Sequence, residues 1–255
     1  MAEGVKDKVC IVTGAAQGIG EGIARLFFAE GAKIAVVDKQ GEKALSVAKS
    51  FAAEDKVIAV KADITIKTEI DAMTEQVLNH FGRIDVLVNN AGKNFFLNPL
   101  EITPTEWDKC LQTDLTGAWI CSQAVLPQML KQGDGNIINI ASIHSYRILK
   151  GCFPYPVAKH ALLGLTRALA IEYADKNIRV NAIAPGLIET PLAEAWFNEF
   201  ADPKLIKQQE IEKIPQKRMG SVTEVAYTAL FLASDEARFI NAECITIDGA
   251  RTVTC

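Results

Sequence analysis

The sequence has few of the residues that build metal sites or disulfide frameworks. Only three histidines occur in 255 residues, and the six cysteines (10, 110, 121, 152, 244 and 255) include no C-x-x-C pair. We therefore predict no metal site and no disulfide framework. Cys10 and Cys244 fall in apolar, strand-like runs typical of core positions, whereas Cys152 lies three residues before Tyr155 and could line a pocket.

An excess of charge and a long apolar run are also absent. The net charge of −4 gives no reason to expect nucleic acid or an anionic membrane as a partner. No run of about 18 apolar residues occurs, and residues 1–7 do not have the pattern of a signal peptide. We therefore expect a soluble, cytoplasmic protein whose partner is a small molecule, with no nucleic-acid and no membrane partner.

What the chain does contain is a regular alternation of strand-like and helical segments, without linkers or repeats. The apolar runs that read as strands are 9–13, 33–37, 57–60, 84–88, 136–140, 178–183 and 243–247. Helical patterns cover 18–30, 41–53, 67–81, 104–131, 155–174 and 222–233. This alternation predicts an α/β fold: one doubly wound, Rossmann-type domain over residues 1–255, with a seven-stranded parallel sheet and helices on both faces.

A glycine-rich turn follows the first predicted strand. Gly14, Gly18 and Gly20 separate the apolar run from a helical pattern that begins at about residue 18. Glycine lets the backbone approach a ligand closely, and a new helix presents free N–H groups with a positive dipole end. This arrangement suits a pyrophosphate, although a plain glycine turn remains an alternative.

An acidic residue ends the second predicted strand. Asp38 lies about twenty residues beyond the glycine turn, where a carboxylate can accept hydrogen bonds from both ribose hydroxyls of a dinucleotide. The same charge would repel a 2′-phosphate. NAD is therefore favoured over NADP.

A third motif combines a serine, a tyrosine and a lysine. Tyr155 and Lys159 are four residues apart at the start of a predicted helix and so share one face. A lysine ammonium there pulls the tyrosine pKa down toward working pH, and Ser142 can bond the same substrate oxygen. Such a tyrosine can exchange a proton with an alcohol. A tyrosine and a lysine four residues apart also occur by chance. The pair indicates catalysis here because the glycine-rich turn and Asp38 precede it.

In this order and spacing, the motifs resemble those of the classical short-chain dehydrogenases/reductases along essentially the whole chain. The matching segments are Thr13 to Gly20, Asn89 to Gly92, Ser142 with Tyr155 and Lys159, and Pro185-Gly186. The resemblance implies that hydride passes between a hydroxyl-bearing carbon and nicotinamide, with Tyr155 as acid/base, Ser142 on the substrate oxygen and Lys159 on the ribose. It also implies a homotetramer.

The resemblance and the predicted strand ends together assign a cofactor-binding set. It comprises Gly14, Gln17, Gly18, Ile19, Gly20, Asp38, Asp63, Ile64, Asn90, Ala91, Gly92, Tyr155, Lys159, Pro185, Gly186, Ile188 and Thr190. Three members have structural alternatives. Asp63 could be a turn or N-cap acid, Asn90 a strand-end pin, and Thr190 a cap before a proline.

One candidate catalytic position departs from the family pattern. Members of the family usually carry an asparagine in the long fourth helix, and Asp114 occupies that place here. A carboxylate would bring negative charge close to Lys159 and raise the lysine pKa. With the serine, tyrosine and lysine intact, we still predict a working enzyme.

The substrate is expected to lie between the loop 143–154 and a substrate-loop region at about 187–216. Candidate contacts are Lys93, Asn94, His144, Cys152 and Trp196. Polar groups mixed with aromatic faces suit a polyhydroxylated substrate. The segment 142–160 also looks like that of bacterial aldose dehydrogenases, which implies oxidation of a sugar at C1. The alternatives are a 3-oxoacyl-carrier ketone reductase and a non-catalytic NAD-binding sensor.

Overall fold

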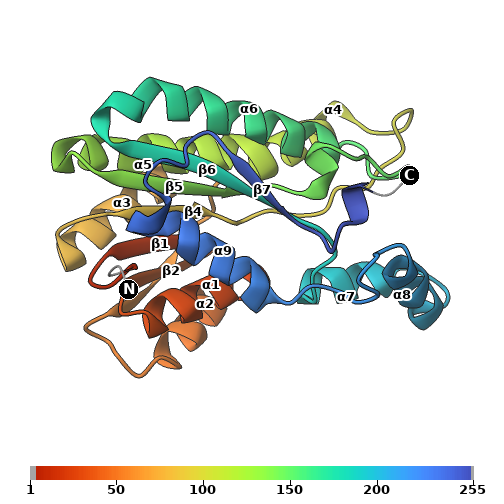
Figure 1. Ribbon diagram of the computed structural model, residues 1–255, viewed down its shortest axis with the longest axis horizontal. Helices are drawn as coiled ribbons and strands as arrows, with labels where there is room; N and C mark the ends of the chain where they lie inside the picture. Colours follow the sequence, from red (N-terminus) through yellow and green to blue (C-terminus); the bar gives the residue numbers. More distant parts are fainter. Residues whose placement is uncertain (1–3, 254–255) are drawn as a thin grey trace.

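The computed structural model describes residues 4–253, and they form one parallel sheet in the order β3-β2-β1-β4-β5-β6-β7 (Figure 1). The strands are β1 (Val9–Thr13), β2 (Lys33–Asp38), β3 (Val57–Lys61), β4 (Val86–Asn89), β5 (Gly135–Ile140), β6 (Ile178–Pro185) and β7 (Cys244–Ile247). The predicted seven-stranded sheet is confirmed. The segment that is expected to lack a signal-peptide pattern begins with residues 1–3, which lie outside the described residues. Cys255 lies outside them as well.

Helices cover both faces of the sheet (Figure 1). One layer contains α1 (Gly18–Ala29), α2 (Gly41–Lys49) and α9 (Val222–Ala233), and the other contains α3 (Lys67–Phe81), α5 (Gly117–Gln132) and α6 (Tyr155–Tyr173). Each layer buries its own apolar cluster against the sheet. The doubly wound fold predicted from the alternation of strands and helices is therefore confirmed.

The burial of β1 shows why these runs become central strands. All five of its residues are buried, and successive side chains point to opposite faces, as the two-residue period of a strand requires. Cys10 and Val12 pack with the α1 and α9 layer, whereas Val9 and Ile11 pack with the α3 and α5 layer. A strand buried on both faces reads as a continuous apolar run, which is the pattern seen in the sequence.

Two parts of the helical prediction are wrong in detail. The segment expected as one helix over 104–131 is divided into α4 (Pro104–Leu111), a π-helical turn over Gln112–Thr116, and α5. The region 187–216, expected as a substrate loop, contains α7 (Pro191–Phe197) and α8 (Pro203–Glu212). Both helices are short and begin at a proline after a capping residue, Thr190 and Asp202 respectively, so neither has a long amphipathic pattern.

The strand order places a binding crevice at the carboxyl end of the sheet. The chain runs outward from β1 through β2 to β3, and then returns to the other side of β1 with β4. Ligands of such sheets bind beyond the carboxyl ends of the strands at this reversal. Helices α7 and α8 extend from the body of the molecule at the same end (Figure 1). Within residues 4–253, no helix has both the length and the apolar character needed to cross a membrane.

Candidate active site

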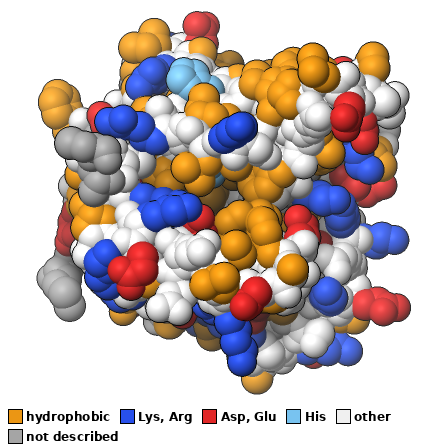
Figure 2. Space-filling model, turned by 90° about the vertical axis from the view of Figure 1, so that its right-hand side faces the viewer, with side chains coloured by type: hydrophobic (Ala, Val, Ile, Leu, Met, Phe, Trp, Pro, Cys, Tyr) orange, Lys and Arg blue, Asp and Glu red, His pale blue; other side chains and the backbone are white. Residues whose placement is uncertain are grey.

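A pocket of about 690 Å³ opens at the carboxyl ends of the strands. Its volume lies within the range of ordinary small-molecule and cofactor sites. Figure 2 shows a hollow in this face, bordered by apolar side chains and by Lys and Arg side chains. Every residue predicted as catalytic, cofactor-binding or substrate-binding lines this pocket, with Gly20 as the exception.

Gly20 does not line the pocket but packs closely on the glycine turn and on Asn90, which follows β4. A Cβ atom at this position would come within 2.4 Å of Asn90 Nδ2 and 2.5 Å of the Gly14 carbonyl oxygen. Any larger residue would push the two segments apart. Close packing thus accounts for glycine at this position, and its predicted contact with the cofactor stays a prediction.

The start of the first helix has the backbone geometry expected of an anion-binding turn. Gly14 and Gly18 have positive φ values of 64° and 60°, and a Cβ at Gly14 would lie 2.8 Å from Ala91 Cα. The N-cap of α1, Gln17, makes no side-chain capping bond, so no side chain takes the N–H groups of the first turn. These features fit the pyrophosphate of a dinucleotide.

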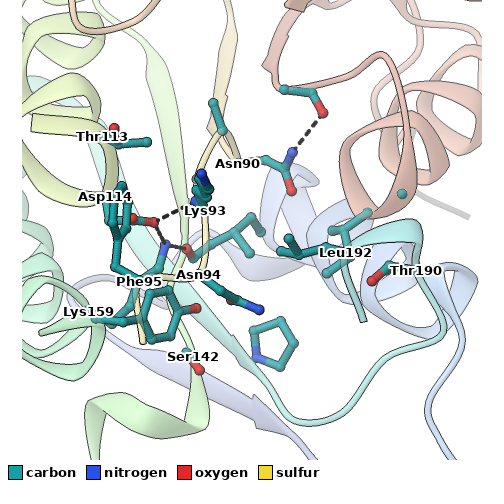
Figure 3. Close-up of a pocket in the computed structure, with 18 of the residues that line it drawn as sticks. Asn90, Lys93, Asn94, Phe95, Thr113, Asp114, Ser142, Lys159, Thr190 and Leu192 are labelled. Carbon is teal, nitrogen blue, oxygen red and sulfur yellow. Dashed lines mark hydrogen bonds and ion pairs between the residues drawn. The ribbon is translucent and has the colours of Figure 1, made fainter. Parts of the chain in front are cut away.

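Thr13 and Asn90 tie the ends of β1 and β4 together. The Thr13 hydroxyl accepts from the backbone N–H groups of Asn90 (3.0 Å) and Ala91 (3.1 Å) and donates to the Val88 carbonyl (3.2 Å). The Asn90 amide donates in turn to the carbonyl oxygens of Thr13 (2.9 Å) and Gly14 (3.1 Å; Figure 3). Asn90 therefore pins the strand end and lines the pocket at once.

Asp38 is fixed at the far end of the pocket from the serine and tyrosine. Its carboxylate accepts from the backbone N–H of Ala16 in the glycine turn (3.3 Å) and from that of Gln40 (2.9 Å). The side chain lines the pocket although the residue is 8% exposed. Asp63 also lines the pocket, and its carboxylate accepts from the backbone N–H and the hydroxyl of Thr65. The alternative role of Asp63 as a turn residue is therefore observed.

The start of α6 brings Tyr155 and Lys159 together. Lys159 Nζ lies 5.6 Å from the centre of the Tyr155 ring and donates to the Ile140 carbonyl (3.1 Å). Burial raises the pKa of Tyr155 above its ordinary value, while Lys159 and the Ser142 hydroxyl lower it part of the way back. The expected net fall in this pKa is therefore wrong.

Asp114 forms a buried ion pair with Lys159. Its Oδ1 lies 3.3 Å from Lys159 Nζ and accepts from the backbone N–H of Lys93 at 3.2 Å (Figure 3). A Cβ at Gly92 would come within 2.6 Å of this oxygen, so the approach requires glycine. Burial raises the pKa of Asp114, and Lys159 opposes that rise. Burial lowers the Lys159 pKa, but Asp114 and Tyr155 outweigh it and raise it, as the sequence predicted.

Aromatic rings surround the reacting side of Tyr155. Phe96 and His144 approach its ring edge-on, with centroids 5.9 and 6.0 Å away, and Trp196 of α7 packs on Phe96 at 6.4 Å. Cys152 is 8% exposed, and burial raises its pKa, which keeps it a thiol. The predicted substrate candidates are thus gathered around one space.

Two pocket residues escaped the sequence analysis. Glu210 of α8 and Arg251, in a 3₁₀ turn after β7, both line the pocket and form an ion pair with each other. Neither belongs to a recognisable motif, because the side chains meet only after α8 and the C-terminal turn have folded against one another. Acidic and basic residues in short polar segments gave no signal that could have found them.

Comparison with known proteins agrees with this geometry. A family model described as Enoyl-(Acyl carrier protein) reductase matches residues 14–251. The chain is 40% identical to a 2-(R)-hydroxypropyl-CoM dehydrogenase from Xanthobacter autotrophicus, over 96% of this chain and 98% of the relative.

Two solved structures are similar throughout. A levodione reductase superimposes with a TM-score of 0.94 at 34% identity, covering 98% of this chain and 99% of that one. An aldohexose dehydrogenase of Thermoplasma acidophilum has a TM-score of 0.91 at 31% identity, covering 100% and 98%. The chain belongs to the short-chain dehydrogenase/reductase family and is an oxidoreductase acting on CH–OH or carbonyl groups.

Proposed function

We propose that this protein transfers a hydride between a hydroxyl-bearing carbon of a sugar or polyol and NAD. The observation that carries the proposal is the arrangement of one pocket. Ser142, Tyr155 and Lys159 lie in one part of it, and the glycine turn with Asp38 lies in another. A dinucleotide that spans the pocket would bring its nicotinamide to the tyrosine.

The residues of the chain would handle the proton and the charge on oxygen. Bound nicotinamide supplies the hydride acceptor or donor. Ser142 holds the substrate oxygen, and Tyr155 takes the hydroxyl proton in oxidation or gives one in reduction. Lys159 lies beside the ring, where its positive charge favours the phenolate. Asp114 neutralises this buried ammonium and fixes its position.

NAD rather than NADP is proposed because of Asp38. The carboxylate is held by two backbone N–H groups, so it is unable to swing away from an added 2′-phosphate. Lys39 also lines the pocket, but its side chain is exposed and carries no comparable restraint. A fixed anion in a partly buried position has the stronger electrostatic effect.

The sugar or polyol part of the proposal is supported by the mixture of groups near Tyr155. The rings of Phe96 and Trp196 offer apolar faces, whereas Asn94 and His144 offer hydrogen-bonding groups. Such a mixture suits a compact substrate with several hydroxyls. The cytoplasmic location and the homotetramer stay predictions.

The 3-oxoacyl-carrier reductase remains a second candidate, because the matching family model carries an acyl-carrier description. Asp38 argues against it, since biosynthetic reductions usually draw on NADPH. The non-catalytic sensor is weakened by the side-by-side arrangement of Tyr155 and Lys159.

Initial rates of NADH formation with a panel of aldoses, polyols and secondary alcohols, each with NAD and with NADP, test the proposal. We expect turnover of an aldose or polyol with NAD at least tenfold above that with NADP. Turnover only of acyl thioesters with NADPH would contradict it. So would calorimetric binding of NAD without oxidation of any alcohol.

A further inference from the structure

Buried polar side chains link two central strands of the sheet to the helices that cover them. Asn89 of β4 and Asn139 of β5 are paired residues of the sheet, and the Asn89 amide donates to Asn139 Oδ1 at 2.9 Å. Both residues are buried, and α5 and α6 cover the same face of the sheet (Figure 1). Amides inside an apolar layer need hydrogen-bond partners. Each of these two asparagines finds one on a helix.

On α6 the partner is Thr166. Its hydroxyl accepts from Asn139 Nδ2 at 2.9 Å and donates to the Leu162 carbonyl at 2.8 Å. Lys159 lies seven residues before Thr166, which is about two turns along the same face of the helix. Its ammonium donates to the carbonyl of Ile140, the residue that follows Asn139. Helix α6 is therefore bonded to adjacent residues of β5 at two points along its length.

On α5 the partners are Ser122 and the carbonyl of Ala118. Asn89 Nδ2 donates to Ser122 Oγ at 3.1 Å and to the Ala118 oxygen at 3.2 Å, and the Ser122 hydroxyl donates to the same carbonyl at 2.7 Å. Asp114 lies four residues before Ala118, in the π-helical turn that leads into α5. The ion pair of Asp114 with Lys159 thus joins two helical segments that are each bonded to the sheet.

The position of α6 along β5 sets the geometry of the proposed reaction. Ser142 follows β5, three residues after Asn139, whereas Tyr155 begins α6. A slip of the helix along the strand would change the separation of the serine and tyrosine oxygens. Apolar contacts are not directional and resist such a slip weakly, whereas a hydrogen bond has a preferred length and angle. A displacement of about 1 Å can lower a reaction rate about a hundredfold.

We propose that the hydrogen bond from Asn139 to Thr166 positions the reacting groups of the enzyme. Both are positioning residues, because neither lines the pocket. The bond fixes α6 along β5 and thereby holds Tyr155 at the distance from Ser142 that lets both side chains reach one substrate oxygen. The inference rests on the proposed roles of Tyr155 and Ser142, and it holds for any substrate that reacts between them.

A purely stabilising role is the competing explanation, because a buried hydrogen bond also contributes to stability. Thr166→Val removes the hydroxyl with little change of shape and leaves the Asn139 amide without this partner. The double variant Asn139→Leu/Thr166→Val replaces the whole bond by an apolar pair. Replacing both partners costs less stability than removing one, so the urea midpoint should be lower in the single variant than in the double variant. Stability and positioning are then changed separately.

The test measures kcat for the substrate with the highest turnover and the Kd for NAD by calorimetry. We expect kcat to fall about ten- to a hundredfold in Thr166→Val and in the double variant, while the Kd for NAD stays within about threefold. Thr166→Ser keeps the hydroxyl and should retain at least about half of the wild-type kcat.

Thr74→Val is the matched control. The Thr74 hydroxyl is also buried and donates to the carbonyl four residues earlier, as that of Thr166 does, but it lies on α3, which carries none of the proposed catalytic residues. This variant should keep kcat within about twofold of the wild type. An unchanged kcat in Thr166→Val, or a kcat that recovers together with the urea midpoint in the double variant, would overturn the inference.

Crystal structures of the wild type and of Thr166→Val give a measurement that needs no turnover. The separation of Tyr155 Oη and Ser142 Oγ should differ between the two structures by about 0.5 Å or more, the tolerance of a catalytic arrangement. An unchanged separation would overturn the inference.

Failure of this inference is distinguishable from failure of the proposed function. Turnover of a sugar or polyol with NAD, with full activity in Thr166→Val, would leave the proposed function and remove the inference. Turnover of other substrates only, with a low kcat in both variants, would support the inference and remove the sugar. If the wild type oxidises no alcohol, the crystallographic separation decides the inference.

Discussion

The two ends of the pocket are constructed differently. At the cofactor end, Thr13, Asn90 and Asp38 hold strand ends in place through bonds to backbone groups. At the substrate end, the walls come from the short helices α7 and α8 and from the C-terminal turn, which are joined by side-chain ion pairs. Backbone contacts at strand ends are set by the sheet itself, whereas side-chain ties can change with the sequence while the fold stays the same.

This difference explains why one family can bind one type of cofactor and act on many substrates. The sheet fixes the first end, and the second is free to vary. Tyr155 and Lys159, the proposed catalytic group at the start of α6, lie where the two ends meet. Changes at the two ends should therefore have separable consequences, and the following predictions test whether they do.

The largest effect is expected at the meeting point. Tyr155→Phe removes the hydroxyl that exchanges a proton with the substrate, so kcat should fall about a hundred- to ten-thousand-fold. The Kd for NAD by calorimetry should stay within about twofold. Tyr146→Phe is the control, because Tyr146 is 44% exposed and does not line the pocket. Retention of more than about a tenth of wild-type kcat by Tyr155→Phe would remove the tyrosine from the mechanism.

At the cofactor end, Asp38→Asn should change the choice of dinucleotide. Without the carboxylate, kcat/KM with NAD should fall and that with NADP should rise, so their ratio changes about tenfold or more. Asp63→Asn is the matched change, because it neutralises another pocket acid and should alter both cofactors alike. An unchanged ratio in Asp38→Asn would show that another group excludes the 2′-phosphate.

Stability should also differ between the two ends. Thr13→Ala removes a buried hydroxyl that bonds to three backbone groups, and should lower the free energy of unfolding by about 2 kcal/mol. Glu194→Gln breaks the exposed pair with Lys207 between α7 and α8 and should cost less than about 0.5 kcal/mol. Urea denaturation compares the two. Similar losses of unfolding free energy in the two variants would contradict the distinction between an end held by backbone contacts and an end joined by side-chain ion pairs.

A smaller effect is expected from Asp114→Asn. The carboxylate of Asp114 raises the pKa of Tyr155, and oxidation requires the phenolate, so the oxidation rate should increase with pH through that pKa. Removing the charge should move this rise to lower pH by about half a unit or more. The measurement is kcat/KM against pH, with Asp63→Asn as control. A shift to higher pH, or none, would assign Asp114 a structural role only.

The sequence was most informative where function depends on backbone position. Asp38 and Asn90 follow buried strands, and parallel strands bring their carboxyl ends to one edge, so their meeting could be predicted. Glu210 and Arg251 could not be found, because their pairing depends on how α8 and the C-terminal turn pack in space. The π-helical turn at Asp114 was missed for a similar reason. A π-helical turn inserts one extra residue into a helix, which leaves little trace in the spacing of the hydrophobic residues.

The pKa of Tyr155 shows the same limit. The spacing to Lys159 gave the direction of one influence, but the larger influence of burial depends on the completed fold. A sequence reveals which groups are neighbours along a helix. It does not reveal how strongly burial in the folded protein desolvates each of them.

Transfer of deuterium is the most direct test of the central claim. The substrate with the highest turnover in the panel is prepared with deuterium on the carbon that bears the reacting hydroxyl, and the reduced cofactor is weighed by mass spectrometry. The account predicts NADH heavier by one mass unit from the wild-type protein, and none above background from Tyr155→Phe. Reduced cofactor without deuterium would contradict direct hydride transfer in this pocket.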